Sequence, residues 1–473
     1  MGRILRVGLM VLLAAAAGVG IARGEWKDYT PGTPGAIPWQ YEQIDKTTCR
    51  IKPKNTATIQ DKVTIPDQVG SIKVVEIAEN AFFYCSKLTG VKFPSGLITI
   101  GSSAFFGCSN LTGVEFPSGV QTIGNSAFYD CKGLKEVRIS GSVRKIEALA
   151  FSGCSGLKEF KVDEKNASYS QDGGVLFTKD RDSLVSYPRG REGAYEIPGS
   201  VTGINVGAFF GCEGLTAVAI PGCVETIGAS AFQSCSGLTK LTIPGSVKTI
   251  GIYAFYGCGN LNKVYWFADA NCNVDVDAFA SDGIAFPATL YVRKGEMEKI
   301  KDKPWRKKKI TKIVEFCVVT FQDGEGNKLG EQMVESNGAA TAPIAPPWEG
   351  YIVEWQLDGA KYDFSAKVTK DITLVAVWKK KEESTPDNPE TAVESVQLAA
   401  VRAVRNPVGE ALELEGMERA ARVEVYSVVG ARVYAEALRG EPRVEIDARG
   451  WAQGVYVVRV VASDGAKTLR VVK

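Results

Sequence analysis

The most regular feature of the chain is a hydrophobic pattern that returns about every 23 residues. Eight copies of the dipeptide Ala-Phe follow this period, at steps of 23, 23, 23, 58, 23, 23 and 24 residues. Its alanines are Ala81, Ala104, Ala127, Ala150, Ala208, Ala231, Ala254 and Ala278. A cysteine follows four positions after each of the first seven alanines, and a leucine follows three positions later. Repetition at such a period is typical of a solenoid built from one small structural unit.

One complete repeat shows what each unit should form. In the segment Leu-x-x-Val-x-Phe that begins at Leu111, the last two apolar residues lie two apart, so a strand would turn both inward. Pro117 and Gly119 then turn the chain. Ala104 and Cys108, four residues apart, would share one face of a short helical turn. The pattern therefore predicts an α/β solenoid, mostly β with short helical turns, whose stacked coils share one continuous core.

These repeats resemble the BspA-like class of bacterial leucine-rich repeats. The resemblance implies a leucine-rich-repeat solenoid at 62–314, and we assign 25–61 to an N-terminal segment and cap. The long step between the fourth and fifth repeats holds an extra segment near 160–200, which we call the island. We interpret it as a hairpin that turns between Lys179 and Asp182. The period fails at Pro304-Trp305, as expected of a C-terminal cap.

The segment 315–379 has a different pattern, of short strands between Gly and Pro turns. Examples are Val318-Val-Thr-Phe, Gly350-Tyr-Ile-Val-Glu-Trp and Ile372-Thr-Leu-Val-Ala-Val-Trp. These runs resemble the Listeria–Bacteroides repeat, a small β-grasp-like module of surface proteins. That family usually has Gly-Trp where this chain has Glu354-Trp355. We expect such a module here.

The C-terminal segment 401–473 follows a charged, polar linker at 380–400. It opens on Asn406-Pro, continues with Tyr426-Ser-x-x-Gly and Gly454-Val-Tyr, and ends on a basic residue. Alternation at period two predicts a small β-sandwich. The motifs resemble the type A sorting domain of the type IX secretion system. That resemblance implies recognition by this machinery, export across the outer membrane of a Bacteroidota-type bacterium, and removal of the domain with surface attachment of the remainder.

The N-terminus agrees with export. Within 1–24, Arg3 and Arg6 precede an apolar run from Val7 to Val19, and small residues follow. This order predicts a secretory signal peptide, and the run is too short to span a bilayer comfortably. We expect a mature chain with no membrane span, located at the outer-membrane surface or outside the cell.

Charge and residue types argue against several functions. The chain has 56 basic and 54 acidic residues, a net charge of +2, which gives no footprint for nucleic acid. It has no histidine, which excludes Ser-His and Cys-His nucleophile pairs and every His-containing metal site. We therefore expect no enzyme, no cofactor and no metal.

The repeated cysteines allow two interpretations. They are Cys85, Cys108, Cys131, Cys154, Cys212, Cys235 and Cys258. Coils about 4.8 Å apart would permit disulfides between neighbours, whose Cα atoms are typically about 4.4–6.8 Å apart. Buried free thiols that pack as small hydrophobes are favoured, because the position points inward and seven is an odd number.

The outward positions of the Leu-x-x-Val-x-Phe strands form the candidate binding surface, because solenoids build extended concave surfaces. We call them the strand face. The residues that we single out are Lys92, Glu115, Glu136, Arg138, Glu159, Lys161, Lys240, Lys263 and Tyr265. The alternative is a solvated face whose ion pairs contribute about 0–1 kcal/mol each.

Shorter motifs carry less weight. Oxygen ligands recur at every second position from Asp269 to Asp277, but Val274 stands where a calcium loop of the EF-hand type needs glycine, so a polar loop is favoured. Asn110 and Asn166 open glycosylation sequons. Asp182-Ser-Leu resembles a short O-glycosylation motif.

Three functions follow from this reading. The first is an adhesin-like protein that binds host matrix or other bacterial surface proteins, as the family resemblance implies. The second is a structural surface spacer without a specific ligand. The third, for which we find no motif, is a hydrolase that uses two carboxylates.

Overall fold

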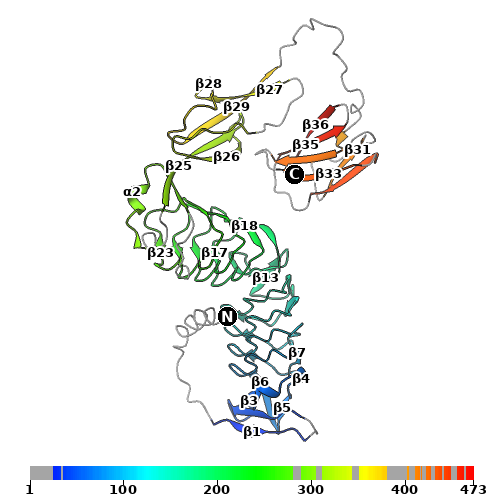
Figure 1. Cartoon of the computed structure of the whole chain (residues 1–473). Coiled ribbons are helices and arrows are strands. Elements are labelled where there is room, and N and C mark those ends of the chain that lie inside the picture. The colour runs from blue at the N-terminus through cyan, green and yellow to red at the C-terminus, as the bar shows by residue number, and fades with distance from the viewer. Residues whose placement is uncertain are drawn as a thin grey trace. The chain divides into compact units, whose positions relative to one another are not determined.

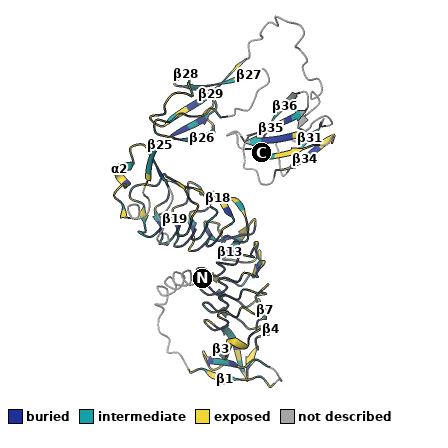
Figure 2. Ribbon diagram, viewed as in Figure 1, coloured by how far each residue is buried: buried dark blue, intermediate teal, exposed yellow. Residues whose placement is uncertain are grey.

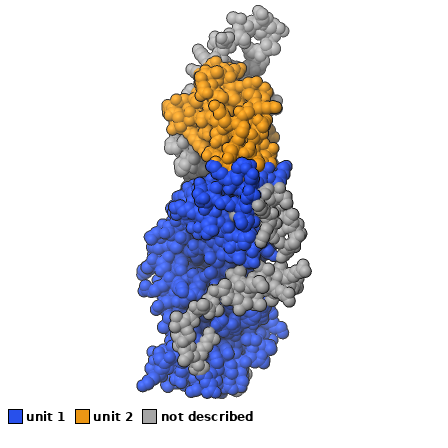
Figure 3. All heavy atoms as spheres, turned by 90° about the vertical axis from the view of Figure 1, so that its left-hand side faces the viewer, with its two compact units in different colours: residues 1–291, 298–313 blue, residues 292–297, 314–473 orange. Residues whose placement is uncertain are grey.

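The computed structural model describes residues 25–32, 36–280, 289–304, 312–343, 351–380, 402–403, 411–415, 417, 422–427, 432–438, 441–448, 455–462 and 465–472. The chain forms two compact units, Met1–Tyr291 with Glu298–Ile313 and Val292–Met297 with Val314–Lys473, which Figure 3 colours separately. The predicted signal peptide at 1–24, the linker beyond its first residue, Trp305 and Asn406 lie outside the described residues.

The first unit begins with a small sheet that covers the end of the solenoid. Its elements are β1 (Lys27–Tyr29), β2 (Trp39–Gln43), β3 (Thr48–Pro53), the 3-10 helix η1 (Thr56–Thr58), β4 (Asp61–Thr64), β5 (Gln68–Val69) and β6 (Ile72–Ile77). Strands β1, β2 and β3 pair antiparallel, and β3 pairs in parallel with β6. The ring of Trp39 packs edge-on against Phe82 at a centroid distance of 6.2 Å. This sheet therefore shields the first ring of the solenoid core.

Coils follow, and we number them by their Ala-Phe dipeptides, from coil 1 at Ala81 to coil 4 at Ala150 and from coil 5 at Ala208 to coil 8 at Ala278. A two-residue strand recurs through the stack as β8 (Thr99–Ile100), β9 (Thr122–Ile123), β11 (Lys145–Ile146), β17 (Gly203–Ile204), β19 (Thr226–Ile227), β21 (Thr249–Ile250) and β23 (Asn273–Val274). They pair in parallel and in register within two separate rows, β8–β9–β11 and β17–β19–β21–β23, with isoleucine opposite isoleucine except that Val274 lies opposite Ile250. Figure 1 shows the resulting stack, which confirms the predicted solenoid.

A second row of strands lies on the segments that correspond to Leu-x-x-Val-x-Phe, together with β16 at the end of the island. It consists of β7 (Leu88–Lys92), β10 (Glu136–Ile139), β12 (Glu159–Val162), β16 (Gly193–Glu196), β18 (Leu215–Ala219), β20 (Lys240–Ile243) and β22 (Lys263–Trp266). They pair in parallel two by two, as β4–β7, β10–β12, β16–β18 and β20–β22. The prediction of a strand that begins at Leu111 is wrong, because residues 111–116 are not in a strand. Among the described residues this segment makes a single backbone hydrogen bond to the preceding coil, from Thr112 N–H to Thr89 O at 3.2 Å, which is too few for a strand.

The Ala-Phe segments are tight turns and not the short helical turns that we predicted. In coil 2 the N–H of Ala104 bonds to Gly101 O and that of Cys108 to Phe105 O, both at 3.2 Å. Ser103 and Gly107 have positive φ, 53° and 72°, which interrupts any helix. In the described part of the chain the α-helix is α2 (Met297–Ile300).

The core of each coil is centred on the phenylalanine of Ala-Phe. Phe82, Phe105, Phe128 and Phe151 stack with centroid distances of 4.9, 5.1 and 5.5 Å. A second stack joins Phe209, Phe232, Phe255 and Phe279 at 4.7, 5.5 and 5.0 Å. Pairs at such distances add about 0.5–1.5 kcal/mol to the burial of each ring. Figure 2 shows buried residues along the inside of both sets of coils.

The island separates these two sets. It forms β13 (Tyr169–Asp172), β14 (Val175–Thr178) and β15 (Ser183–Ser186). Strands β14 and β15 pair antiparallel around the turn that we predicted between Lys179 and Asp182. Strand β15 then pairs in parallel with β17, and Tyr187 stacks on Phe209 at 5.0 Å. The end of the island therefore substitutes for a coil in front of coil 5.

Beyond coil 8 the chain continues into β24 (Thr289–Arg293), where Tyr291 stacks on Tyr265, and into α2. The second unit then contains one mixed sheet of β25 (Lys312–Gln322), β26 (Lys328–Glu335), β27 (Tyr351–Leu357), β28 (Ala360–Lys361) and β29 (Ile372–Lys380). Its first and last strands, β25 and β29, pair in parallel, and β26 and β27 flank them antiparallel. Trp355 and Phe321 pack edge-on in its core. The resemblance of this module to the Listeria–Bacteroides repeat stays a prediction.

The C-terminal part forms two antiparallel sheets. One consists of β30 (Arg402–Ala403), β31 (Ala411–Glu415) and β34 (Arg443–Asp447), the other of β32 (Arg422–Ser427), β33 (Arg432–Ala437), β35 (Val455–Ala462) and β36 (Gly465–Val472). Leu412 and Ile446 of the first sheet and Val425 and Val458 of the second belong to one buried cluster. The two sheets therefore share a core, as the predicted β-sandwich requires.

Candidate functional site

The middle of the strand face is an ion-pair network. The register of β10 and β12 places Glu136 opposite Glu159 and Arg138 opposite Lys161. Like charges face each other, but Arg138 reaches Glu136 at 2.7 Å, and Lys161 bonds to Glu136 and, at 3.2 Å, to Glu159. The hydrogen bond from Lys161 lowers the pKa of Glu136, and the same bond raises the pKa of Lys161. These four predicted residues are brought together, and they satisfy one another.

The ends of the strand face differ from its middle. Lys92, Glu115, Lys240 and Lys263 are exposed, and among the described residues none of them has an ion-pair partner. Lys240 and Lys263 lie directly opposite each other in the pair β20–β22. The free charges of the predicted surface are therefore at its ends.

Tyr265 differs from the prediction of an outward, accessible ring. It is 9% exposed and stacks on Tyr291 at a centroid distance of 4.7 Å. The ammonium of Lys240 lies 4.8 Å from the centre of the Tyr265 ring, a cation–π distance. The ring of Tyr265 therefore packs under the ammonium of Lys240 and is not part of the accessible surface.

The repeated cysteines are buried free thiols, as the favoured interpretation had it. In five coils the Sγ donates to the carbonyl of the Ala-Phe phenylalanine one coil earlier, at 3.0–3.2 Å, from Cys108, Cys131, Cys154, Cys235 and Cys258. Burial raises the pKa of Cys85 to about 11 and that of Cys258 to about 12. Thiols held protonated in this way are packing groups and poor nucleophiles.

The minor motifs have structural partners. Asp269 accepts from the backbone N–H of Asn271 and Asp275 from that of Asp277, so these carboxylates close their own loop. Asn166 is 1% exposed and bonds through its amide to Ser140 and Tyr169, which fastens the island to coil 4. Within the described residues no group of His, Cys, Asp or Glu has the arrangement of a metal site.

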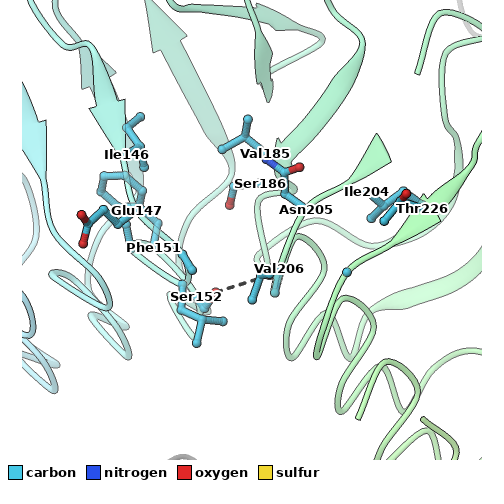
Figure 4. A pocket seen from close by; sticks show the side chains of 15 residues that line it. Ile146, Glu147, Phe151, Ser152, Val185, Ser186, Ile204, Asn205, Val206 and Thr226 are labelled. Carbon is cyan, nitrogen blue, oxygen red and sulfur yellow. Dashed lines mark hydrogen bonds between the residues drawn. The ribbon is translucent and has the colours of Figure 1, made fainter. Parts of the chain in front are cut away.

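A cleft at the break between coils 4 and 5 is a feature that we did not predict. It has a volume of about 280 Å³ and lies between Ile146–Ser152 of coil 4 and Ile204–Gly207 of coil 5, with Val185 and Ser186 of the island. Figure 4 shows Ile146, Glu147 and Phe151 on one side and Val185, Ser186 and Asn205 on the other. We call it the seam cleft. The 58-residue step in the repeat is the sequence signal that marks its place.

The seam cleft has one carboxylate, Glu147, among its lining residues. A glycoside hydrolase of the usual kind needs two, on either side of the substrate. Glu147 is also occupied, since it accepts from the N–H of Asn125 at 2.9 Å and pairs with Lys145 at 2.6 Å. The cleft therefore does not provide the site that the hydrolase alternative needs.

Comparison with known families finds two matches. The BspA type Leucine rich repeat region matches in six copies over residues 56–172 and 194–286. The Secretion system C-terminal sorting domain matches residues 406–473. Leucine-rich-repeat proteins of this class are generally non-enzymatic; the absence of catalysis in this chain stays a prediction. No curated protein sequence matches the chain.

Three solved structures are among those similar to the chain. The pneumococcal vaccine antigen PcpA is 18% identical, with 61% of this chain and 98% of that chain covered and a TM-score of 0.38. A leucine-rich repeat protein from Eubacterium ventriosum is 21% identical, with 63% and 87% covered and a TM-score of 0.38. The leucine-rich-repeat protein TpLRR of T. pallidum is 24% identical, with 44% and 91% covered and a TM-score of 0.28.

The two family matches agree on where the protein works. A C-terminal sorting domain marks a chain for secretion, and the repeats are those of surface proteins. In the described part of the chain no helix is both long and apolar enough to cross a membrane. The chain carries a BspA type leucine-rich-repeat region and a secretion system C-terminal sorting domain, and it is a secreted protein of the cell surface or the extracellular space.

Proposed function

We propose that the chain is an adhesin-like surface protein whose strand face binds other proteins or cell surfaces. The observation that carries this proposal is the pair Lys240 and Lys263. They stand side by side on β20 and β22, both exposed, and neither has an ion-pair partner among the described residues. The network of Glu136, Glu159 and Lys161 in the middle of the strand face already neutralises itself.

The chemistry of this pair indicates the kind of partner. Like charges directly opposite each other on a sheet destabilise it, and a carboxylate from outside would relieve the repulsion. The stack of Tyr265 and Tyr291 under Lys240 gives the pair a rigid support. Complementary charge favours fast and selective association. The expected partner surface is therefore acidic, on a host matrix protein or on another bacterial surface protein.

The experiment compares two double variants of the full secreted chain. Lys240→Glu with Lys263→Glu reverses the charge of the pair, and Lys46→Glu with Lys73→Glu makes the same charge change on exposed lysines of the N-terminal sheet. Binding to immobilised matrix proteins and to bacterial cells should fall at least about tenfold in the first variant only. Equal binding by both variants would move the site elsewhere. No binding by the unmodified chain in a broad screen would favour the spacer alternative.

A further inference from the structure

The tight turn of each coil contains one residue in the left-handed region of backbone conformation. It lies three positions after the alanine of Ala-Phe, and its φ is between 55° and 79° in coils 1 to 7. In four of these coils the residue is a glycine, namely Gly107, Gly153, Gly211 and Gly257. In the other three coils it is Tyr84, Asp130 or Ser234. The fold therefore requires a backbone conformation at this position that suits glycine best.

Tyr84 of coil 1 is the least suitable of these residues for a positive φ. A bulky side chain in the left-handed region is an outlier, whereas glycine and aspartate adopt this conformation more readily. Burial does not compensate for the strain, because Tyr84 is 46% exposed and its hydroxyl has no hydrogen-bond partner among the described residues. Strain that adds little to the core is typical of functional sites.

Two further aromatic rings lie beside Tyr84. Phe83 is 37% exposed and packs edge-on against Tyr84 at a centroid distance of 4.7 Å. Phe106 of coil 2 stacks on Phe83 at 5.0 Å and contacts Tyr84 at 5.4 Å. Tyr129 of coil 3 stacks in turn on Phe106 at 4.7 Å and holds it in place. We call Phe83, Tyr84 and Phe106 the aromatic platform.

Polar groups of coil 3 border the platform. A Cβ at Gly107 would lie 2.7 Å from Cδ1 of Tyr84, so the ring of Tyr84 lies over coil 2 at this glycine. Asp130 has the corresponding position in coil 3. Burial and the charge of Asp130 raise the pKa of Tyr84, so the hydroxyl keeps its proton and can donate. Asp130 pairs with Lys132 at 3.3 Å. A hydroxyl, a carboxylate and an ammonium group therefore accompany the exposed rings.

We propose that the aromatic platform binds the sugar rings of a neutral oligosaccharide. The C–H groups on one side of a hexose form an apolar surface, which packs on an aromatic ring because the face of that ring is negatively polarised. Sugar hydroxyls donate and accept, so they can bond to Asp130, to Lys132 and to the hydroxyl of Tyr84. Such a contact gives a reason for a strained tyrosine where coils 2, 4, 5 and 7 have glycine.

Ligands of other chemistry match the platform less well. An anion would meet the carboxylate of Asp130, and a cation would meet the ammonium of Lys132. A wholly apolar molecule would remove water from this ion pair without replacing its hydrogen bonds. A neutral ligand rich in hydroxyl groups avoids each of these penalties.

The platform is also too small for a stable contact with a folded protein. A fully covered aromatic side chain buries about 150–250 Å², so exposures of 37% and 46% leave roughly 150–200 Å² of Phe83 and Tyr84 in all. Specific protein interfaces bury about 800 Å² on each partner. At the position of Phe83, coils 4 and 6 have Ser152 and Gln233, so the exposed rings do not continue along the solenoid. The exposed aromatic area suits a short oligosaccharide.

The first experiment applies the full-length chain to an array of oligosaccharides. The array carries neutral glycans of glucose, galactose, mannose and N-acetylglucosamine, together with sialylated and sulfated forms of them. Neutral glycans should bind, and their charged forms should bind no more tightly. Hydroxyl-radical footprinting then locates the contact, since a bound neutral glycan should protect Phe83 and Tyr84 from oxidation. Ile98, which is 41% exposed, is the control and should stay as reactive as before.

Tyr84→Gly separates binding from folding. It gives coil 1 the glycine that four other coils have, so relief of the strained backbone offsets the lost ring contacts and the unfolding midpoint should not fall. Binding of the neutral glycan that the array selects should weaken at least about tenfold. Ser234→Gly, the same position in coil 6, is the matched control and should bind as the unmodified chain does. Lys240→Glu with Lys263→Glu should also leave glycan binding unchanged, which separates the platform from the strand face.

Four results would contradict the proposal. One is an array on which no neutral glycan binds the chain. Another is a bound glycan that leaves Phe83 and Tyr84 as reactive as before. A third is equally tight glycan binding by Tyr84→Gly and the unmodified chain. The fourth is a protein freed of its glycans that binds the unmodified chain but not Tyr84→Gly, which would assign the platform to a polypeptide partner.

Discussion

The thiol of Cys131 donates a hydrogen bond to the carbonyl oxygen of Phe105, 3.1 Å away in the preceding coil. Both residues are fully buried, so this carbonyl has no access to water. The same bond recurs between other neighbouring coils, at Cys108, Cys154, Cys235 and Cys258. The cysteine of the repeat therefore satisfies a buried backbone acceptor while it packs as a small apolar side chain.

Cys131→Ala should destabilise the solenoid by about 0.5–1.5 kcal/mol, because it removes one of the two hydrogen bonds to the carbonyl of Phe105, which keeps the one from Cys108 N–H, and opens a small void. The measurement is the midpoint of urea unfolding of the full chain. Cys272→Ala is the matched control, since Cys272 is only half-buried and should cost less. Equal midpoints for the two variants would show that the bond does not contribute.

The same burial predicts a loss of stability in alkali. Burial raises the pKa of Cys85 to about 11 and that of Cys258 to about 12, from a usual value of 9.0. The folded chain holds these protons more tightly than the unfolded chain, so their contribution is complete below pH 9.0 and is lost as the pH rises toward those values.

Urea midpoints should therefore fall as the pH rises from about 9 to about 12. Lysines and tyrosines titrate in the same range, so the comparison is with Cys131→Ser, which removes one deeply buried thiol whose pKa burial raises. The decline should be shallower in this variant. A decline as steep as that of the unmodified chain would assign the effect to other groups.

Gly124→Ala tests how closely the coils approach. A Cβ at Gly124 would lie 2.7 Å from the backbone nitrogen of Ser102 in the preceding coil, so the coils would have to separate. Overpacking of this kind typically costs about 1–3 kcal/mol. Gly113→Ala is the control, because a Cβ there meets nothing within 4 Å. Thermal unfolding of both variants should show a lower midpoint for Gly124→Ala alone.

Deletion of 401–473 tests the sorting domain in the cell. Because the family match places a secretion system C-terminal sorting domain at 406–473, the truncated chain should accumulate in the periplasm instead of reaching the surface. Deletion of 315–379 is a control of similar length, and that variant should still be exported. Fractionation with surface proteolysis distinguishes the two compartments, and undiminished surface display of the truncated chain would refute the role of the domain.

The solenoid could be predicted from the sequence. A single coil cannot bury its own apolar face, so the 23-residue period and the inward apolar positions already require stacked coils. The sequence did not predict the turns at Ser103 and Gly107, because the spacing of Ala104 and Cys108 suits a helical turn as well as two tight ones. The sequence predicts an exposed Tyr265, because the alternation of inward and outward residues along β22 does not show that the ring of Tyr291 packs on it. The ends of the strand face could be named from the sequence, but the register that pairs Lys240 with Lys263 comes from the coils themselves.

The seam cleft could not be predicted from the sequence, for a related reason. The 58-residue step shows that the repeat is interrupted, but not which hydrogen bonds the island restores. Tyr187 N–H donates to Ala208 O in front of coil 5, and the Tyr169 hydroxyl accepts from Ile146 N–H behind coil 4. Among the described residues no acceptor meets the N–H groups of Leu149 and Phe151. Contacts between residues far apart in the chain decide this, and no local pattern encodes them.

Tyr169→Phe tests the cap at the edge of the first set of coils. It removes the hydroxyl that accepts from the N–H of Ile146 at 2.7 Å, in a residue that is 8% exposed. A buried N–H left without an acceptor costs about 1–3 kcal/mol, so the unfolding midpoint should fall and the amide of Ile146 should exchange faster. Tyr84→Phe, on an exposed ring, is the control and should change neither quantity. An Ile146 amide that stays as protected as before would mean that a group other than the Tyr169 hydroxyl protects it from exchange.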